Sequence, residues 1–270
     1  MNDTLAFEEE TFHFDGAGLE LEPETTWEIE SPEQSPEETV RRFSSNTGCV
    51  DALRKAGKTK EQALAIINAQ IALAIRMLRL AADRLKQDAR TPRTKAIFHK
   101  IFRVQPDFVP TWFKPTASLK DRGDVVAVRC RRVADLLASG TLKLFCSINS
   151  TDCPDCGNDN SDFACSSWGD ESVAPRRSNV ICLGAPFWDD MRAGNASSLR
   201  STLMHEPFHI YFGKYVTAHE RADGKSVGKF GGITCIVRFV FEINNQTPPQ
   251  RVIDRCKATV VRSAATGYGP

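Results

Sequence analysis

Three of the five histidines of this 270-residue chain, His205, His209 and His219, lie within fifteen residues of one another. The first two enclose the sequence His-Glu-Pro-Phe-His. Residues i and i+4 share one face of a helix, so both imidazoles could bind one Zn²⁺, with Glu206 beside them as general base. The pattern therefore predicts His205 and His209 as zinc ligands and Glu206 as the catalytic residue. The alternative is a helix whose histidines only fill or cap its surface.

Residues 197–211 should form the helix that carries this motif, with a serine at its start and Gly213 past its end. Pro207 lies inside the motif and lacks the amide that would bond to Leu203, a defect that costs about 3 kcal/mol in a helix interior. Either the helix is kinked inside the motif, or it begins later than Ser197 and Pro207 falls in its first turn.

The elements around the motif follow from periodicity and turn residues. Thr59 and Gln62 form a capping box before a long amphipathic helix that extends to Leu85. A second helix is predicted for residues 121–139, and Gly140 stops it. Two short strands are expected at 141–146 and 178–183, and residues 233–241 fit a helical face that could also be a strand. Helices, a small sheet and then helices again indicate an α+β fold, mostly helical.

The cysteine pattern favours structural disulfides. The chain has nine cysteines, an odd number that leaves at least one thiol unpaired if the others are bonded. Cys146, Cys153, Cys156 and Cys165 crowd a stretch rich in Asn, Asp, Ser and Gly, where disulfides would offset the lack of a local core. A zinc ribbon would need a second Cys-x-x-Cys, which the sequence lacks, and a thioredoxin-type site would need a strand-to-helix turn. Disulfide use places the protein outside the reducing cytosol.

The charge is divided unevenly along the chain. Thirteen of the 34 acidic residues lie in residues 1–40, which contain no Lys or Arg; the other 21, against 35 basic residues, give 41–270 a net charge of +14. An acidic segment of this kind is either a disordered leader or a tail that makes an intramolecular contact. We therefore expect an acidic, partly disordered extension at 1–45, a main domain at 46–262 and a tail at 263–270.

Composition also excludes several classes of protein. The most apolar stretch, residues 63–85, is interrupted by charged side chains, so no membrane span is expected. The first thirty residues show acidic residues where a secretory signal would carry basic ones, so delivery would use a route without a classical signal peptide. The basic residues are spread along the helices without an aromatic module, so no nucleic-acid partner is expected.

Several segments in order resemble the deuterolysin and lysine-specific metallo-endopeptidase family, the aspzincins. They are a cysteine before an Ala-rich helix (49–85), Trp112-Phe113, a cysteine-bearing strand, and the sequences Ile-Cys-Leu-Gly-Ala-Pro-Phe-Trp (181–188) and Ser-Thr-Leu-Met-His-Glu-Pro-Phe-His-Ile-Tyr (201–211). The resemblance covers about residues 45–256. It implies a zincin-like fold, zinc held by the two motif histidines, a glutamate that activates water, and hydrolysis of peptide bonds in a protein or peptide substrate.

The chain departs from the family downstream of the motif. Val227 stands where the family has an aspartate as third zinc ligand, and Phe230 stands where it has a tyrosine. Catalytic zinc sites use three protein ligands plus water, so a substitute is needed. We favour His219 over Glu220 and Asp223, because neutral imidazole suits zinc best.

The sequence thus predicts a zinc-dependent metallo-endopeptidase. Many cysteines without a secretory signal would suit a bacterial toxin or effector that a dedicated machine secretes. Tyr211, Tyr215 or an arginine would have to stabilise the oxyanion in place of the family's tyrosine. The alternative is a catalytically degenerate zincin-fold binding protein, which Val227 and Phe230 favour.

Overall fold

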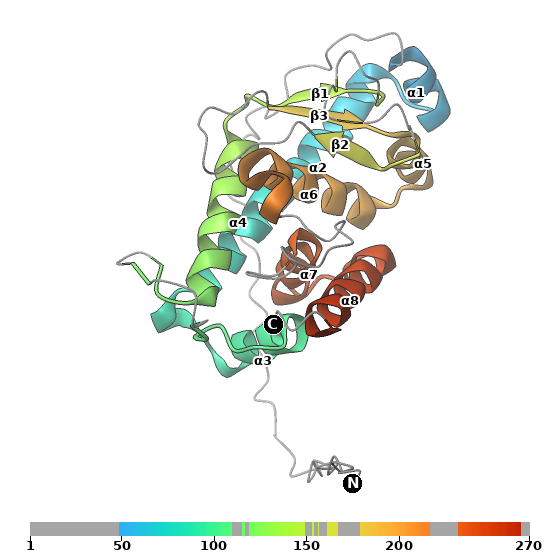
Figure 1. The fold of residues 1–270 in the computed structure, drawn as a ribbon. Coiled ribbons are helices and arrows are strands. Elements are labelled where there is room, and N and C mark those ends of the chain that lie inside the picture. The colour runs from blue at the N-terminus through green and yellow to red at the C-terminus, as the bar shows by residue number, and fades with distance from the viewer. Residues whose placement is uncertain are drawn as a thin grey trace, which may run out of the picture. The chain divides into compact units, whose positions relative to one another are not determined.

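A computed structural model describes residues 49–109, 115–116, 119–148, 153, 156, 161–166, 179–216 and 232–265, with side chains to residue 210 in the helix that ends at 216 and to 258 in the last helix. The chain divides into two units, and all of these residues lie in the second, Pro36–Pro270. In chain order the elements are α1 (Cys49–Ala56), α2 (Lys60–Arg84), η1 (Gln87–Ala89), α3 (Pro92–Phe102), α4 (Arg122–Ala138), β1 (Lys143–Phe145), β2 (Ala164–Ser166), β3 (Val180–Leu183), α5 (Ala185–Ala193), α6 (Ala196–Val216), α7 (Ile233–Ile243) and α8 (Gln250–Ala265). This is a mostly helical α+β arrangement with a small sheet, which confirms the predicted fold class at that level (Figure 1).

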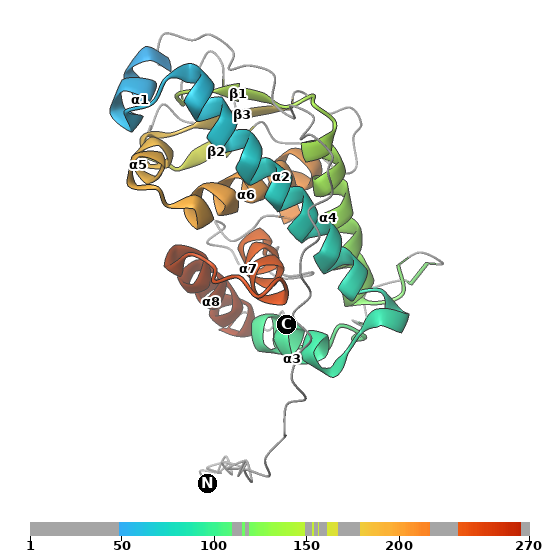
Figure 2. The ribbon, with the colours of Figure 1, turned by 180° about the vertical axis from the view of Figure 1, so that it is seen from behind.

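Helix α2 runs along one face of the unit and packs against α4, α6 and α7 (Figure 2). It begins as the capping box predicts: the Thr59 hydroxyl accepts from the Gln62 amide at 3.2 Å, and the Gln62 side chain accepts from the Thr59 amide at 3.0 Å. The predicted apolar face is buried in the core, with one partly buried member, Leu64. Its fully buried members are Ile67, Ile71, Ala74, Leu78, Ala81 and Leu85.

Helix α2 is also long and apolar enough, by length and composition alone, to cross a membrane. The core helix of a globular protein passes the same test, and the apolar face of α2 is buried against the neighbouring helices. The test is therefore weak evidence for a membrane span, and the absence of a span stays a prediction.

Helix α4 has the predicted bounds, with Asp121 as its N-cap and Ser139 as its C-cap. The Asp121 carboxylate accepts from the Asp124 amide at 2.9 Å and pairs with the guanidinium of Arg90 at 2.6 and 2.8 Å. This buried ion pair joins the segment before α3 to the start of α4.

The sheet has the strand order β1-β3-β2, with β1 parallel and β2 antiparallel to β3. Strands β1 and β3 lie within the two predicted runs. The third strand, β2, was not predicted, because it lies inside the cysteine-rich stretch and is only three residues long. The sheet lies at one end of the unit, and β2 and β3 contact α6 (Figure 1).

The structure excludes the later start considered for the motif helix and corrects its predicted end. Helix α6 begins at Ala196 and contains Pro207 in its interior, so a later start does not spare it the cost of that proline. It also continues past Gly213 to Val216, because a glycine inside a helix costs only about 1 kcal/mol and need not end it.

The sequence analysis also did not predict helices α1, α3, α5 and α8. Proline misled the prediction for α3 and α5, where it occupies the first turn and its missing amide costs nothing. Residues 233–241, left open between helix and strand, form α7. Helix α8 extends through Ala265, beyond residue 262 where the tail was placed.

Four disulfides confirm the structural role predicted for the cysteines. They join Cys49 to Cys146, Cys153 to Cys182, Cys156 to Cys165 and Cys235 to Cys256. The ninth, Cys130, is free and fully buried on α4, and burial raises the pKa of its thiol to about 12. Four disulfides in one chain indicate an oxidising, extracellular environment.

Candidate metal centre

His205, Glu206 and His209 come together on α6, and their ligand atoms all lie within 4.8 Å of one another. The Nε2 atoms of the two histidines are 3.0 Å apart, as i and i+4 spacing on one helical face requires. His209 and Glu206 are buried, and His205 is half-buried. The three motif residues are thus brought together as predicted.

The separation of the two ring nitrogens suits a shared metal. Zinc–nitrogen bonds of 2.0–2.1 Å at a tetrahedral angle place two ligand nitrogens about 3.3 Å apart. The observed 3.0 Å is also the length of a hydrogen bond between the rings, in which one Nε2 donates and the other accepts. The distance between the Nε2 atoms is therefore compatible with a shared metal ion, which would require both atoms to be unprotonated. The geometry does not identify the ion.

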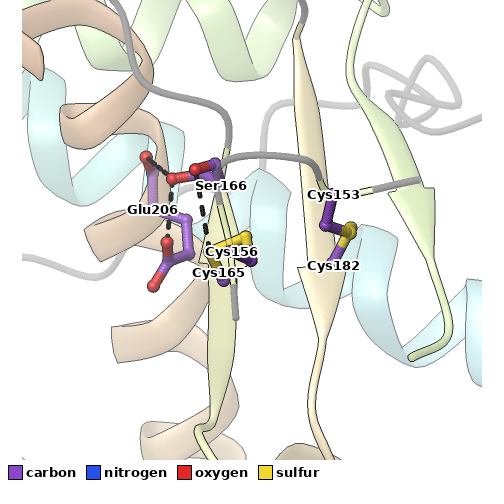
Figure 3. The surroundings of a disulfide bond; sticks show 6 residues. All are labelled: Cys153, Cys156, Cys165, Ser166, Cys182 and Glu206. Carbon is purple, nitrogen blue, oxygen red and sulfur yellow. Dashed lines mark hydrogen bonds between the residues drawn. A yellow bond between two sulfur atoms is a disulfide. The ribbon is translucent and has the colours of Figure 1, made fainter. Parts of the chain in front are cut away.

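Glu206 is hydrogen-bonded to Ser166, a residue of strand β2. The Ser166 hydroxyl lies 2.9 Å from Oε2 of Glu206 and 3.2 Å from its carbonyl oxygen, so it shares its proton between these acceptors (Figure 3). Ser166 is 1 % exposed. Since a buried hydroxyl that donates to a carboxylate restricts its rotation, Ser166 orients the predicted general base.

Two disulfides fix the strand that carries Ser166. Cys165 precedes it on β2 and bonds to Cys156, and Cys182, which pairs with Cys165 across the sheet, bonds to Cys153 (Figure 3). Both covalent links are therefore anchored at the same position along the sheet, directly before the serine that contacts Glu206.

The far side of α6 anchors the motif in the core. Leu203, Phe208 and Ile210 are each 0 % exposed, so they bury the back of the helix. Because Phe208 lies between Glu206 and His209, packing of its ring fixes the rotation of the helix and hence the direction of the polar face.

A cavity of about 220 Å³ opens in front of the cluster. It is bounded by β2 and the residues before it, by α6, by the start of α7 and by α8. Its charged and polar lining residues are Asp162, Ser166, Ser201, Thr202, His205, Glu206, His209, Thr234, Arg251 and Arg255. A cavity that contains both histidines and the carboxylate gives a substrate access to all three.

A polar stripe leads along α6 to the histidines. Ser198, Ser201 and Thr202 precede His205 by seven, four and three residues, so they lie on the same helical face. Nη2 of Arg251, on α8, lies 2.8 Å from the hydroxyls of Ser201 and Thr202 and 3.2 Å from that of Ser198. The stripe thus connects α8 to the face that carries the metal-binding residues.

Sequence reasoning missed Ser166 and assigned no role to Arg251. No local signal marks Ser166, because its contact with Glu206 spans 40 residues. The hydroxyl stripe before His205 does carry a helical period in the sequence, and it could have indicated a polar partner for that face.

The proposed third ligand and its competitors lie outside the described residues. These are His219, Glu220 and Asp223, together with the departures at Val227 and Phe230. The side chains of Tyr211 and Tyr215 also lie beyond the described side chains. The third ligand and the oxyanion-stabilising residue therefore stay predictions.

Comparison of the chain with protein families, curated proteins and solved structures finds no match.

Proposed function

We propose that the protein is a zinc-dependent metallo-endopeptidase with a zincin-like domain. The observation that carries the proposal is the juxtaposition of His205 Nε2, His209 Nε2 and the Glu206 carboxylate at one wall of a cavity. A helix that presents two imidazoles and a carboxylate in this order has the parts of a metal-assisted hydrolase. The resemblance to the aspzincins narrows this chemistry to peptide bonds.

Zinc bound to His205 and His209 would polarise the scissile carbonyl and lower the pKa of a coordinated water toward 7. Both ligands belong to a helix whose back face is buried, so their separation is fixed before any ion arrives. Such pre-organisation favours binding, because little side-chain entropy is left to lose.

Glu206 would take the proton of the attacking water and pass it to the leaving amine. The Ser166 hydroxyl occupies one lone pair of Oε2, so the carboxylate keeps a fixed orientation and still has acceptor sites for water. Ser166 is therefore a positioning residue for the general base.

His219 is our choice for the third ligand, ahead of Glu220 and Asp223. The four disulfides agree with a place of action outside the reducing cytosol, as for a secreted toxin or effector. The substrate would be a protein or peptide, and we expect no nucleic-acid partner.

A second function, that of a binding protein on a degenerate zincin scaffold, is favoured by Val227 and Phe230. The two functions differ in what they require of Glu206. A peptidase needs its carboxylate, whereas a binding protein needs only the shape of the cavity.

The test replaces Glu206 by glutamine in the full chain. Glu206→Gln should keep the metal and the fold but lose peptidase activity by several orders of magnitude, because an amide cannot accept the proton. Asp162→Asn, which neutralises the other carboxylate of the same cavity, is the matched control and should retain most activity. Equal turnover of a peptide library by wild type and Glu206→Gln would refute this role of Glu206.

A further inference from the structure

The cavity in front of the metal-binding residues contains two arginines, Arg251 and Arg255, one helical turn apart on α8. Its acidic lining residues are Glu206 and Asp162. A divalent cation at the histidines would therefore leave the cavity with a net positive charge. A cavity of that sign concentrates anionic groups of a substrate.

Arg251 is a partly buried cation whose direct hydrogen-bond partners among the described residues are all neutral. Its Nη2 atom donates to the carbonyl and hydroxyl of Ser198 and to the hydroxyls of Ser201 and Thr202. The connection to a carboxylate is indirect, since the Ser198 hydroxyl in turn donates to Asp190. Guanidinium groups in proteins commonly bind carboxylates through two parallel hydrogen bonds, and this one has no such partner in the described part of the chain.

The rest of the guanidinium is placed for a ligand. Its Nε is buried without a hydrogen-bond partner among the described residues, and its Cζ lies 3.9 Å from the centre of the Phe163 ring. Stacking on the ring fixes the plane of the group, and a buried donor without an acceptor carries a desolvation penalty. The donor left for a ligand is Nη1, which makes no hydrogen bond among the described residues and is not counted among the buried atoms without a partner.

Burial lowers the pKa of Arg251 to about 10, with a smaller contribution from Arg255, and the charges of Asp190 and Glu206 act in the opposite direction. The guanidinium is therefore protonated at neutral pH and carries a full charge into the cavity. The guanidinium contacts Ser201 and Thr202 on α6, and these residues precede His205 by about one helical turn.

We propose that Arg251 and Arg255 form a carboxylate-binding subsite beside the metal-binding residues. The carboxylate belongs either to an Asp or Glu side chain of the substrate or to its free C-terminus. One turn of helix is about 5.4 Å, which is less than the span of two extended residues, so the carboxylate would lie close to the bond that is cut. The use of this subsite in cleavage rests on the proposed peptidase function, whereas carboxylate binding does not.

The experiment measures binding by calorimetry rather than turnover. The full-length Glu206→Gln protein, loaded with zinc, is titrated with acetylated and amidated hexaalanine peptides that carry one Glu, or the matched Gln, at each position in turn. Acetyl-hexaalanine with a free carboxyl, compared with its amide, forms the second arm. One Glu position should bind about tenfold tighter than its Gln match if the source is a side chain, and the free-carboxyl peptide should do so if the source is the C-terminus.

Three variants then assign the effect. Arg251→Gln and Arg255→Gln should each reduce the tenfold ratio severalfold. Arg251→Lys should keep only part of it, because a lysine keeps the charge but not the planar guanidinium that stacks on Phe163. Lys257→Gln, exposed on the same helix and outside the cavity lining, is the matched control and should leave the ratio unchanged. Thermal unfolding shows whether loss of the Arg251 contacts to α6 disturbs the fold, and Arg255→Gln tests the subsite without touching those contacts.

Equal affinities for all charged and neutral peptides would overturn the proposal. So would a tenfold ratio that survives in both Arg251→Gln and Arg255→Gln. If the peptides with a carboxylate bind tighter but the wild-type protein shows no peptidase activity, the proposed enzyme is refuted and the subsite is established.

Discussion

The two walls of the cavity are built in different ways. The α6 wall, which carries His205 and His209, is backed by the main hydrophobic core through side chains that are fully buried. The β2 wall, which carries Ser166, packs on the main core through one partly buried residue, Ala164, and is otherwise backed by a small apolar cluster of four buried residues, two of them disulfide-bonded cysteines. Packing holds the first wall, and covalent bonds hold the second.

This difference separates two requirements of the site. The ligands of a metal must keep a fixed separation, and a helix on a large core provides it without further support. The orientation of Glu206 depends on a three-residue strand, which contributes little apolar area of its own and pairs with β3. The cross-links Cys156–Cys165 and Cys153–Cys182 supply what the small cluster lacks.

The largest effect on stability should come from the α6 wall. Phe208→Ala removes a ring that is 0 % exposed, so we expect a loss of about 3–5 kcal/mol in the free energy of unfolding, together with loss of metal binding. Phe108→Ala, at a ring that is 40 % exposed, is the matched control and should cost under about 1 kcal/mol. Similar losses measured by urea unfolding for both variants would contradict the account of this wall.

The β2 wall should respond in its function more than in its stability. Replacing both Cys156 and Cys165 by serine removes a link across nine residues, which is worth about 2–3 kcal/mol in the chain-entropy estimate. The zinc content should be kept, because α6 holds the ligands, whereas peptidase activity should fall at least tenfold as Ser166 loses its position. Cys130→Ala, at the thiol that forms no disulfide, is the control. Loss of zinc together with activity would show that the two walls are not independent.

A smaller change isolates the contact between the walls. Ser166→Ala removes the hydrogen bond to Oε2 of Glu206, so we expect a cost of about 1–2 kcal/mol in stability and a several-fold loss of kcat with KM nearly unchanged. Ser197→Ala, in the first turn of α6, should change neither. An unchanged kcat in Ser166→Ala would remove the positioning role of this serine.

The acidic extension gives the smallest expected effect. With thirteen carboxylates in residues 1–40 against the +14 of residues 41–270, we expect residues 1–45 to lie across the basic surface and restrain activity. Each exposed charge pair contributes about 0–1 kcal/mol, so the aromatic residues Phe12, Phe14 and Trp27 should decide whether the segment stays bound. A protein that begins at residue 46 should cleave faster than the full chain, and the difference should narrow at high salt. Equal rates at low salt would leave the extension without an inhibitory role.

The sequence predicted best where the signal is local. The capping box at Thr59, the period of α2 and the His-Glu-x-x-His spacing each concern residues within one or two turns, and the structure has them as expected. Prolines misled the prediction at α3 and α5, because the same residue that breaks a helix interior is favoured in a first turn.

The second wall of the cavity could not be predicted, because its contacts are long-range. Ser166 reaches Glu206 across 40 residues, and Arg251 reaches Ser201 across 50. Strand β2 is short and lies in a stretch of polar residues, so it lacks the alternating pattern that would reveal it. Only the folded chain brings these side chains to the predicted motif.

Elemental analysis of zinc in the purified full chain tests the central claim most directly. We expect about one zinc per chain, its loss in His209→Ala, and a far greater weakening in His219→Ala than in Glu220→Ala or Asp223→Ala. Loss of one of three ligands should lower the affinity for zinc strongly, whereas loss of a nearby carboxylate that is not a ligand should leave the affinity nearly unchanged. Protein prepared without chelator that contains no zinc would contradict the claim that His205 and His209 form a metal site.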